Sequence, residues 1–137
     1  MKYWLAVGPP ENWLFTFNHD NIWGFNDENA ISWKRISAGD ILIPYVTTPI
    51  KGLIGYCTVN SKVVGGKIYF PQEIKTDGLI WKLRLTLNSN KIIPEQDWHS
   101  KAIHLDNRKF GLQKSLSMLN ESLAKDFIKK LDKILVQ

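Results

Sequence analysis

Two strand-like segments of this chain contain residues that a flat, regular β-sheet accommodates poorly. The segment 41–47 is apolar on both faces and includes Pro44, which cannot donate a backbone hydrogen bond to a neighbouring strand. The segment 53–59 carries Gly55, and a glycine inside a strand is typical of a bulge or a sharp bend. We therefore expect the strands to bulge or reach a sheet edge at these positions, and the sheet to curl toward a barrel.

The other segments predict a mostly β domain with five or more short strands and about three helices. The run 3–7 reads as a buried strand that a glycine and two prolines end. Further expected elements are a helical turn at 11–15, a helix at 30–36 closed by Gly39, a hairpin around Gly65-Gly66, a strand over 79–87, an irregular segment 88–108 anchored by Trp98, and a strand or loop over 110–119.

The segment 79–87 shows the clearest alternation of apolar and polar residues. One face carries Trp81, Leu83, Leu85 and Leu87, and the other carries Lys82, Arg84 and Thr86. We therefore assign Trp81 to the hydrophobic core and expect the opposite face to be wet and basic.

A C-terminal helix is predicted after Asn120, which is a favourable N-cap residue. Apolar residues recur at helical spacing along it, at Leu123, Phe127, Leu131 and Ile134. The lysines of this segment lie off the apolar stripe, so we read them as a solvated face.

Length, charge and cysteine content limit the class of protein. The 137 residues suffice for one domain, 1–137, and no apolar run approaches the ~18 residues of a membrane span. Lysine and arginine outnumber the acidic residues by 18 to 13, and the net charge of +5 favours anionic partners. The single Cys57 lies in an apolar segment, so we expect a buried, inert thiol in a cytoplasmic protein that has no secretory signal.

The residue patterns that carry catalysis are missing from the sequence. His19, His99 and His104 have neither cysteine partners nor the spacing of metal ligands. There is no phosphate-binding glycine loop and no nucleophile motif. Asp40 stands at a strand start, where capping of the preceding turn explains it. We therefore expect a protein that is not an enzyme and that uses no metal and no cofactor.

Aromatic residues mixed with hydrogen-bonding groups are abundant instead. Trp23 precedes Gly24 just after a polar turn, and glycine lets a ligand or another backbone approach closely. Trp23 could therefore wall a slot for a planar ring, or it could belong to the core while Gly24 turns the chain. A curled sheet could bring further groups beside it: Trp4, Trp13, Tyr45, Asn12 and Thr47. Stacking on such a wall contributes ~1–3 kcal/mol per nucleic-acid base.

Several short motifs follow one another in a recognisable order. They are Tyr3-Trp4, Asn12-Trp13, Asn21-Ile22-Trp23-Gly24-Phe25, Ala38-Gly39-Asp40, Leu42 to Thr47, Ile54-Gly55 and Arg108-Lys109-Phe110. This order resembles that of the EVE domain family, a PUA-like group related to YTH domains. The resemblance covers nearly the whole chain and is strongest over 1–60. It implies an α+β fold, a PUA-like mixed β-barrel of about five to six strands flanked by short helices and a C-terminal helix.

The resemblance also implies a nucleic-acid-binding module that holds a modified, methylated base in an aromatic pocket. Trp23 with Gly24 matches the tryptophan-glycine motif that supplies the wall of this pocket. The remaining matches are Tyr45 and Thr47 on the strand that passes the pocket, Asn12 and Trp13 on the loop that closes it, and Lys109 and Gln113 near its mouth.

The partner implied by the resemblance is DNA or RNA that carries a modified base. Relatives of this fold serve as specificity domains of modification-dependent restriction systems, which implies a restriction-type nuclease or NTPase as a further partner. Two alternatives stay open. One is a small-molecule-binding or cryptic enzymatic PUA-like domain that uses the same pocket, and the other is an interaction module without a ligand.

Overall fold

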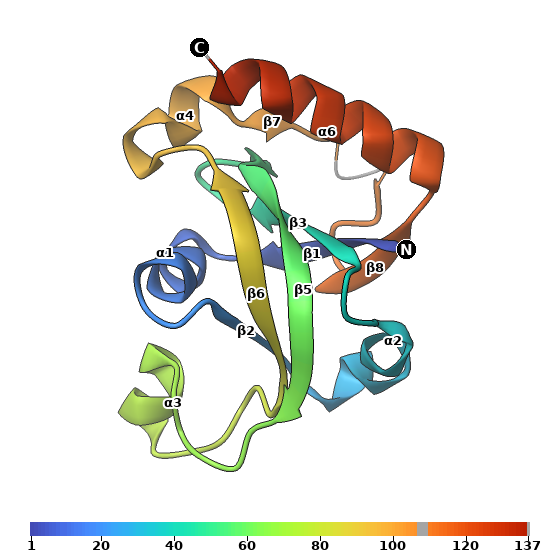
Figure 1. Cartoon of the computed structure of the whole chain (residues 1–137). Helices are drawn as coiled ribbons and strands as arrows, with labels where there is room; N and C mark the ends of the chain where they lie inside the picture. The colour runs from blue at the N-terminus through green and yellow to red at the C-terminus, as the bar shows by residue number, and fades with distance from the viewer. Residues whose placement is uncertain (107–109, 137) are drawn as a thin grey trace.

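The computed structural model describes residues 1–106 and 110–136 of the chain. It is an α+β domain in which helices flank one curled sheet (Figure 1). The strands are β1 (Tyr3–Gly8), β2 (Ile22–Phe25), β3 (Ile41–Val46), β4 (Gly52–Leu53), β5 (Gly55–Val64), β6 (Leu83–Ile92), β7 (Ile103–His104) and β8 (Leu116–Leu119). The helices are α1 (Pro10–Asn18), α2 (Ala30–Arg35), α3 (Pro71–Thr76), α4 (Trp98–Lys101) and α6 (Glu121–Leu135), with short 3-10 turns η1 (Asp27–Asn29) and η2 (Glu95–Asp97).

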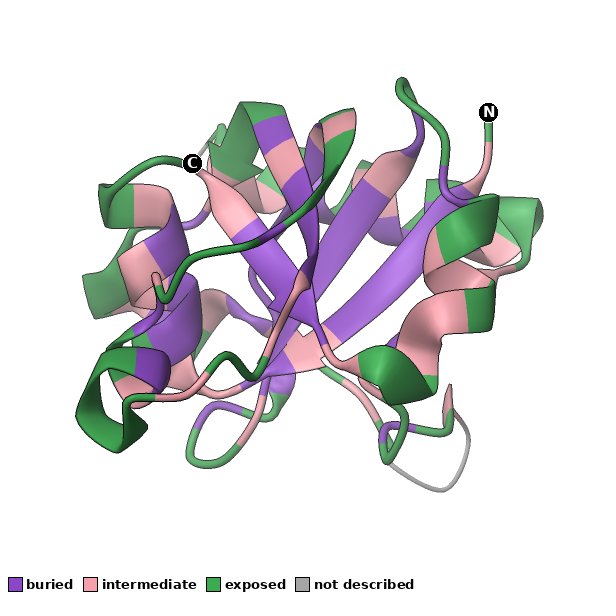
Figure 2. Cartoon of the chain, turned by 90° about the horizontal axis from the view of Figure 1, so that it is seen from below, coloured by how far each residue is buried: buried purple, intermediate pink, exposed green. Residues whose placement is uncertain are grey.

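The sheet is mixed and curls into a half-barrel. Its order is β2-β6-β5-β3-β1-β8, and the short strands β4 and β7 pair off this path. The neighbours β1 and β3 run parallel, whereas β8 pairs antiparallel with β1. The central strands are buried along most of their length (Figure 2), and α6 lies across one end of the sheet with Phe127 and Leu131 in the core. The expected α+β architecture with a C-terminal helix is confirmed.

Pro44 lies where β3 changes its partner. On one side β3 pairs with β1 in an unbroken parallel register that sets Ala6 opposite Pro44. On the other side β3 pairs with β5 as far as Leu42 and with β4 from Tyr45 onward. The missing N–H of Pro44 falls between these two partners, so no ladder bond is lost. The bulge expected at Pro44 is therefore absent.

Gly55 begins β5 instead of lying inside it. A Cβ at this position would come within 2.2 Å of the carbonyl oxygen of Lys91 on β6, so only glycine permits this approach. The register of the β5–β6 pair then shifts twice, first between Tyr56 and Thr58. The irregularity expected near Gly55 is thus confirmed, and it bends the longest strand pair of the sheet.

The connection between β5 and β6 is longer than the sequence predicts. In place of a hairpin around Gly65-Gly66, residues 65–82 form loops on either side of α3. The alternation within β6 is confirmed, because its first three leucines are all buried. Two assignments in this region are wrong: Trp81 precedes the strand, which begins at Leu83, and Arg84 is only 7% exposed although a wet face was expected.

Helix ends agree with the predicted caps in one case of two. The Asn120 side chain accepts hydrogen bonds from the backbone N–H groups of Ser122 and Leu123, which confirms it as the N-cap of α6. Helix α2 ends at Arg35, before Gly39 is reached. Gly39 has φ +92 and serves the turn into β3, so its predicted role as helix terminator is wrong.

The described part of the predicted irregular segment 88–108, residues 88–106, is more ordered than expected. It contains the end of β6, η2, α4 and β7. Trp98 anchors it as predicted, because its buried indole donates a hydrogen bond of 2.7 Å to the carbonyl of Ile93. In the segment 110–119, residues 111–115 form turns and bends that lead into β8 at Leu116.

Cys57 is buried in β5, and its thiol donates to the carbonyl of Leu42 at 3.6 Å. Burial raises the pKa of this thiol, so it stays protonated, as expected of an inert side chain. Within the described residues, none of the helices has the length and apolar character needed to cross a membrane.

The buried carboxylate of Asp40 joins β1 to the turn before β3. Its oxygens accept hydrogen bonds from the backbone N–H groups of Lys2 and Ser37, both at 2.9 Å, and from the indole of Trp4 at 3.0 Å. Burial alone raises the pKa of this carboxyl, but the hydrogen bonds outweigh burial and hold the pKa below its usual range. The capping role predicted for Asp40 is confirmed.

We expect Asp40→Ala to lower the free energy of unfolding by about 1–3 kcal/mol, because it leaves buried donors such as the Trp4 indole without a partner. Urea unfolding at neutral pH measures this loss. Asp27→Ala is the control, since its mostly exposed carboxylate pairs with Lys82 at 3.2 Å and contributes at most about 1 kcal/mol. Equal losses in the two variants would contradict the role of Asp40.

Candidate functional site

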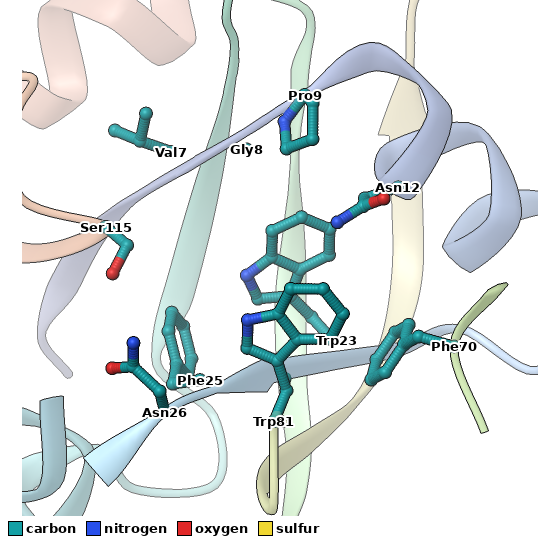
Figure 3. Close-up of a pocket in the computed structure, with 11 residues that line it drawn as sticks. Val7, Gly8, Pro9, Asn12, Trp23, Phe25, Asn26, Phe70, Trp81 and Ser115 are labelled. Atoms are coloured by element: carbon teal, nitrogen blue, oxygen red, sulfur yellow. The ribbon is translucent and has the colours of Figure 1, made fainter. Parts of the chain in front are cut away.

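A small cavity of about 80 Å³ lies where the end of β1 meets β2. Its walls come from the β1–α1 junction, from β2, from the loops on both sides of α3, and from the residue that precedes β8. The lining residues are Val7, Gly8, Pro9, Asn12, Trp23, Gly24, Phe25, Asn26, Phe70, Trp81 and Ser115 (Figure 3). None of them is charged, so the cavity suits a neutral, flat group.

The indole of Trp23 lies flat against that of Trp13. The ring centroids are 3.5 Å apart and the planes differ by 3°. Trp13 donates a hydrogen bond of 3.0 Å to the carbonyl of Tyr45, which ties the stack to β3. Gly8 makes room for it, because a Cβ there would lie 2.3 Å from the Trp23 ring. Trp23 is therefore both a core residue and a wall of the cavity, and Trp13 supports it from behind.

Two polar groups of the cavity have unused hydrogen-bonding capacity. The indole nitrogen of Trp23 is buried and has no partner among the described residues, and Figure 3 shows it facing the side where Asn26 and Ser115 lie. Asn12 uses its Oδ1 to accept a hydrogen bond of 2.5 Å from Gln72, and its amide nitrogen points toward the Trp23 ring. A buried donor without a partner costs about 1–3 kcal/mol, so the Trp23 N–H marks a place for an acceptor atom of a ligand, and the Asn12 amide offers a second donor beside it.

Phe70 and Trp81 close the cavity from the loops around α3. Their rings meet edge to face, with centroids 5.4 Å apart. Trp81 is half-buried and presents its indole to the same cavity as Trp23. Gly24 allows this wall to approach β2, since a Cβ there would lie 2.7 Å from the Cβ of Trp81.

The assignment of Trp81 to the core is therefore wrong, because the alternation used to make it applies only from Leu83, where β6 begins. Phe70 was not predicted at all. The only sequence signal for either residue is Gly24, whose lack of a side chain indicates a close neighbour without identifying it.

One buried carboxylate, that of Glu73, holds both of these aromatic residues. It is fully buried and accepts hydrogen bonds from four backbone N–H groups. The donors are Tyr69 and Phe70 to Oε1, both at 3.0 Å, and Ile80 and Trp81 to Oε2, at 2.8 and 2.9 Å. The loops before and after α3 are thus fastened to a single side chain.

Arg84 balances the charge of Glu73. Its Nη2 lies 3.0 Å from Oε1 of Glu73 and also donates to the carbonyl of Lys67 at 2.8 Å, while its Nε donates to the carbonyl of Trp81 at 3.0 Å. Burial by itself raises the pKa of the Glu73 carboxyl, but the backbone hydrogen bonds outweigh it and hold the pKa below its usual range. Glu73 therefore stays ionised at neutral pH and fixes the position of Trp81.

The structure divides the predicted site residues between two places. Asn12, Trp23 and Gly24 line the first cavity, and Trp13 backs it. Asn12 and Trp13 lie on α1, so they belong to a helix and not to a closing loop. Tyr45 and Thr47 line a second cavity. Gln113 is exposed and lines neither cavity, and Lys109 lies outside the described residues.

The prediction that these residues share one pocket is therefore wrong for the residues that the structure describes. The physical reason is the Trp13 indole, which stacks on Trp23 and bonds to the backbone of Tyr45. It fills the space between the two strands from which a single pocket would have formed.

The fold matches known structures although the sequence does not. Neither a protein-family model nor a curated protein sequence matches this chain. One similar solved structure is Rpa0253 from Rhodopseudomonas palustris, with a TM-score of 0.59 and 12% sequence identity over 97% of this chain and 94% of that one. A second is ASCH from Zymomonas mobilis, with a TM-score of 0.61 and 16% identity over 96% of this chain and 94% of that one. A third is the YTH domain-containing protein Mmi1 in complex with RNA, with a TM-score of 0.63 and 9% identity over 98% of this chain and 83% of that one. The chain has the PUA-like fold of ASCH and YTH domains.

The stability of the protein should depend on Glu73 in acid. Because folding holds the pKa of this carboxyl below its ordinary value of 4.5, its contribution is complete above that value and is lost as the pH falls through the folded-state pKa. We expect the difference in unfolding free energy between wild type and Glu73→Gln to be constant near neutrality and to shrink in acid. Urea unfolding at a series of pH values measures it, and the Asp40 contribution cancels because both proteins share it. A difference that does not change with pH would contradict this account.

Proposed function

We propose that this protein is a nucleic-acid-binding domain that holds a flat, modified base against Trp23 and Trp81. The observation that carries the proposal is a cavity lined by two indoles, in which one buried indole N–H has no partner in the part of the chain that the structure describes. Aromatic walls bind a ring by stacking, and the free N–H groups of Trp23 and Asn12 are donors for the acceptor atoms at a base edge.

The size of the cavity favours a single ring over a larger ligand. Pockets that enclose drug-sized molecules measure ~300–1,000 Å³, whereas this one measures about 80 Å³. It has room for one flat group at most, so the sugar and phosphate of a nucleotide would stay outside. A methyl substituent would gain contact with the apolar atoms of Val7, Phe25 and Phe70, which line the same space.

The fold and the net charge support a nucleic acid as the partner. One structure with this fold, that of Mmi1, was solved in complex with RNA. The chain carries a charge of +5, which favours a polyanion. The motif order that resembles EVE domains adds the expectation of a modified base. We propose DNA or RNA as the carrier of that base, and a nuclease or NTPase as a further partner stays a prediction from the resemblance.

We also propose that the protein binds without catalysing a reaction. The cavity contains no titratable side chain, and no group of three His, Cys, Asp or Glu residues within the described segments could hold a metal ion. Its polar groups are amides, a hydroxyl and an indole N–H, which recognise a ligand but do not supply a nucleophile paired with a base.

Substitution of the two wall tryptophans should separate folding from binding. We expect Trp81→Ala to retain the fold, because Trp81 is half-buried, and to lose about 1–3 kcal/mol of base binding. Trp23→Ala should lose similar binding and also about 3–5 kcal/mol of stability, because its ring is buried against Trp13. Trp33→Ala is the control, a half-buried tryptophan on α2 outside the cavity. Thermal melts and oligonucleotide titrations measure both effects; full binding by Trp81→Ala would contradict the proposed site.

A binding screen against modified oligonucleotides tests the ligand itself. The probes are single-stranded DNA and RNA that carry N6-methyladenine or 5-methylcytosine, each beside the unmodified sequence. We expect one modified probe to bind more tightly than its control, with an affinity that falls as salt rises by a log–log slope of about 0.7 for each phosphate contacted. The small-molecule alternative would be favoured if the free modified nucleoside bound and if the affinity for every oligonucleotide were independent of salt.

A further inference from the structure

A second cavity, of about 380 Å³, lies at the end of β3. It is lined by Tyr45, Thr47, Thr48, Lys51, Leu105 and Leu112. Its chemistry differs from that of the aromatic cavity, because its described lining residues supply a cation and three hydroxyl groups and no carboxylate. Hydroxyl and ammonium groups that converge on one space are typical of a site for an anion.

The polar groups of this second cavity are unused by the protein. Within the described part of the chain, the hydroxyls of Tyr45, Thr47 and Thr48 make no hydrogen bond, and Lys51 makes no ion pair. Tyr45 is only 5% exposed as a residue and lines this cavity, and among the described residues its hydroxyl has no hydrogen-bond partner. Burial raises the pKa of this phenol, so it remains a hydrogen-bond donor at neutral pH.

The two cavities lie back to back at the carboxyl ends of the parallel strands β1 and β3. Gly8 at the end of β1 lines the aromatic cavity, and Thr47 just after β3 lines the second one. The backbone N–H of Thr47 donates a hydrogen bond of 3.0 Å to the carbonyl of Gly8, so the strand ends that border the two cavities are direct neighbours.

A second segment also connects the two cavities. Leu112 lines the second cavity and Ser115 lines the aromatic one, and the carbonyl of Ser115 accepts a hydrogen bond of 3.0 Å from Val7 on β1. The exposed residues Gln113 and Lys114 lie between them along the chain. Residues 112–115 therefore border both cavities.

We propose that the second cavity binds the phosphodiester group adjacent to the base held in the aromatic cavity, so that the protein takes a segment of nucleic-acid strand and not an isolated base. This inference rests on the proposed function. The aromatic cavity has no charged group and is too small for a phosphate beside a base, whereas the neighbouring cavity offers Lys51 and the hydroxyls of Tyr45 and Thr47.

The variants Lys51→Ala and Tyr45→Phe test the proposal, and Lys34→Ala is the control. Lys34 is an exposed lysine before the start of β3, roughly 20 Å from the cavity by the length of the strand. The probes are RNA and DNA pentanucleotides with a central N6-methyladenine or 5-methylcytosine, together with the corresponding free nucleosides. Lys51→Arg is added as a variant that keeps the charge. Affinities are measured over a range of salt concentrations, and thermal melts test whether each variant is folded.

We expect Lys51→Ala to bind the pentanucleotide about 3–10-fold more weakly and to lower the salt slope by about 0.7, which is the contribution of one phosphate contact on a single strand. Tyr45→Phe should weaken it less, and Lys51→Arg and Lys34→Ala should leave it unchanged. Nucleoside binding should be the same in all variants. Wild-type affinity and slope in Lys51→Ala, or an equal loss of nucleoside binding, would overturn the inference.

Failure of the proposed function gives a different result. In that case the wild-type protein binds neither the pentanucleotides nor the nucleosides. Titration with inorganic phosphate, followed by NMR, then tests whether the second cavity binds an anion. Shifts confined to the amides of residues 45–51 and absent in Lys51→Ala would keep it as an anion site. No shift there would overturn it as well.

Discussion

The stack of Trp13 on Trp23 is the contact on which both cavities depend. It joins α1 to β2, and the hydrogen bond from Trp13 to the carbonyl of Tyr45 extends it to β3. Gly8 permits this arrangement, because any side chain there would displace the Trp23 ring. One cavity lies against Trp23 and the other lies beyond Tyr45, with the buried indole between them. The aromatic wall is thus held in place by the protein alone, which would lower the entropy lost in the base binding that we propose.

The opposite wall of the aromatic cavity is held by hydrogen bonds instead of packing. Phe70 and Trp81 come from the long β5–β6 connection, and the Glu73 carboxylate fastens both of their backbone N–H groups. Arg84 neutralises that carboxylate within the protein. A buried carboxylate is stable there only because every one of these donors is present, since a buried charge without partners is costly. The site therefore combines one rigid wall from the core with one wall that a single polar cluster positions.

Part of the site could be predicted from short-range sequence features. Trp23 next to Gly24 indicated an aromatic wall with a close neighbour, and Asn12 was correctly associated with it. Trp81 could not be placed, because its alternation with the leucines of β6 continues past the point where the strand begins. Glu73 gave no signal at all, since its four backbone partners lie on two separate loops.

The sequence by itself determined the class of fold, because the features that indicate it are local patterns that backbone and burial preferences decide. These features are the strand-like runs with Pro44 and Gly55, the Asn120 cap and the apolar stripe of the last helix. Only the tertiary structure decided which aromatic residues share a cavity and that Tyr45 belongs to a second one. Those facts depend on the pairing of β2 with β6 and of β1 with β3, which brings together residues far apart in the chain. The physical reason is that side-chain periodicity reports which face of an element is buried, but not which other element covers that face.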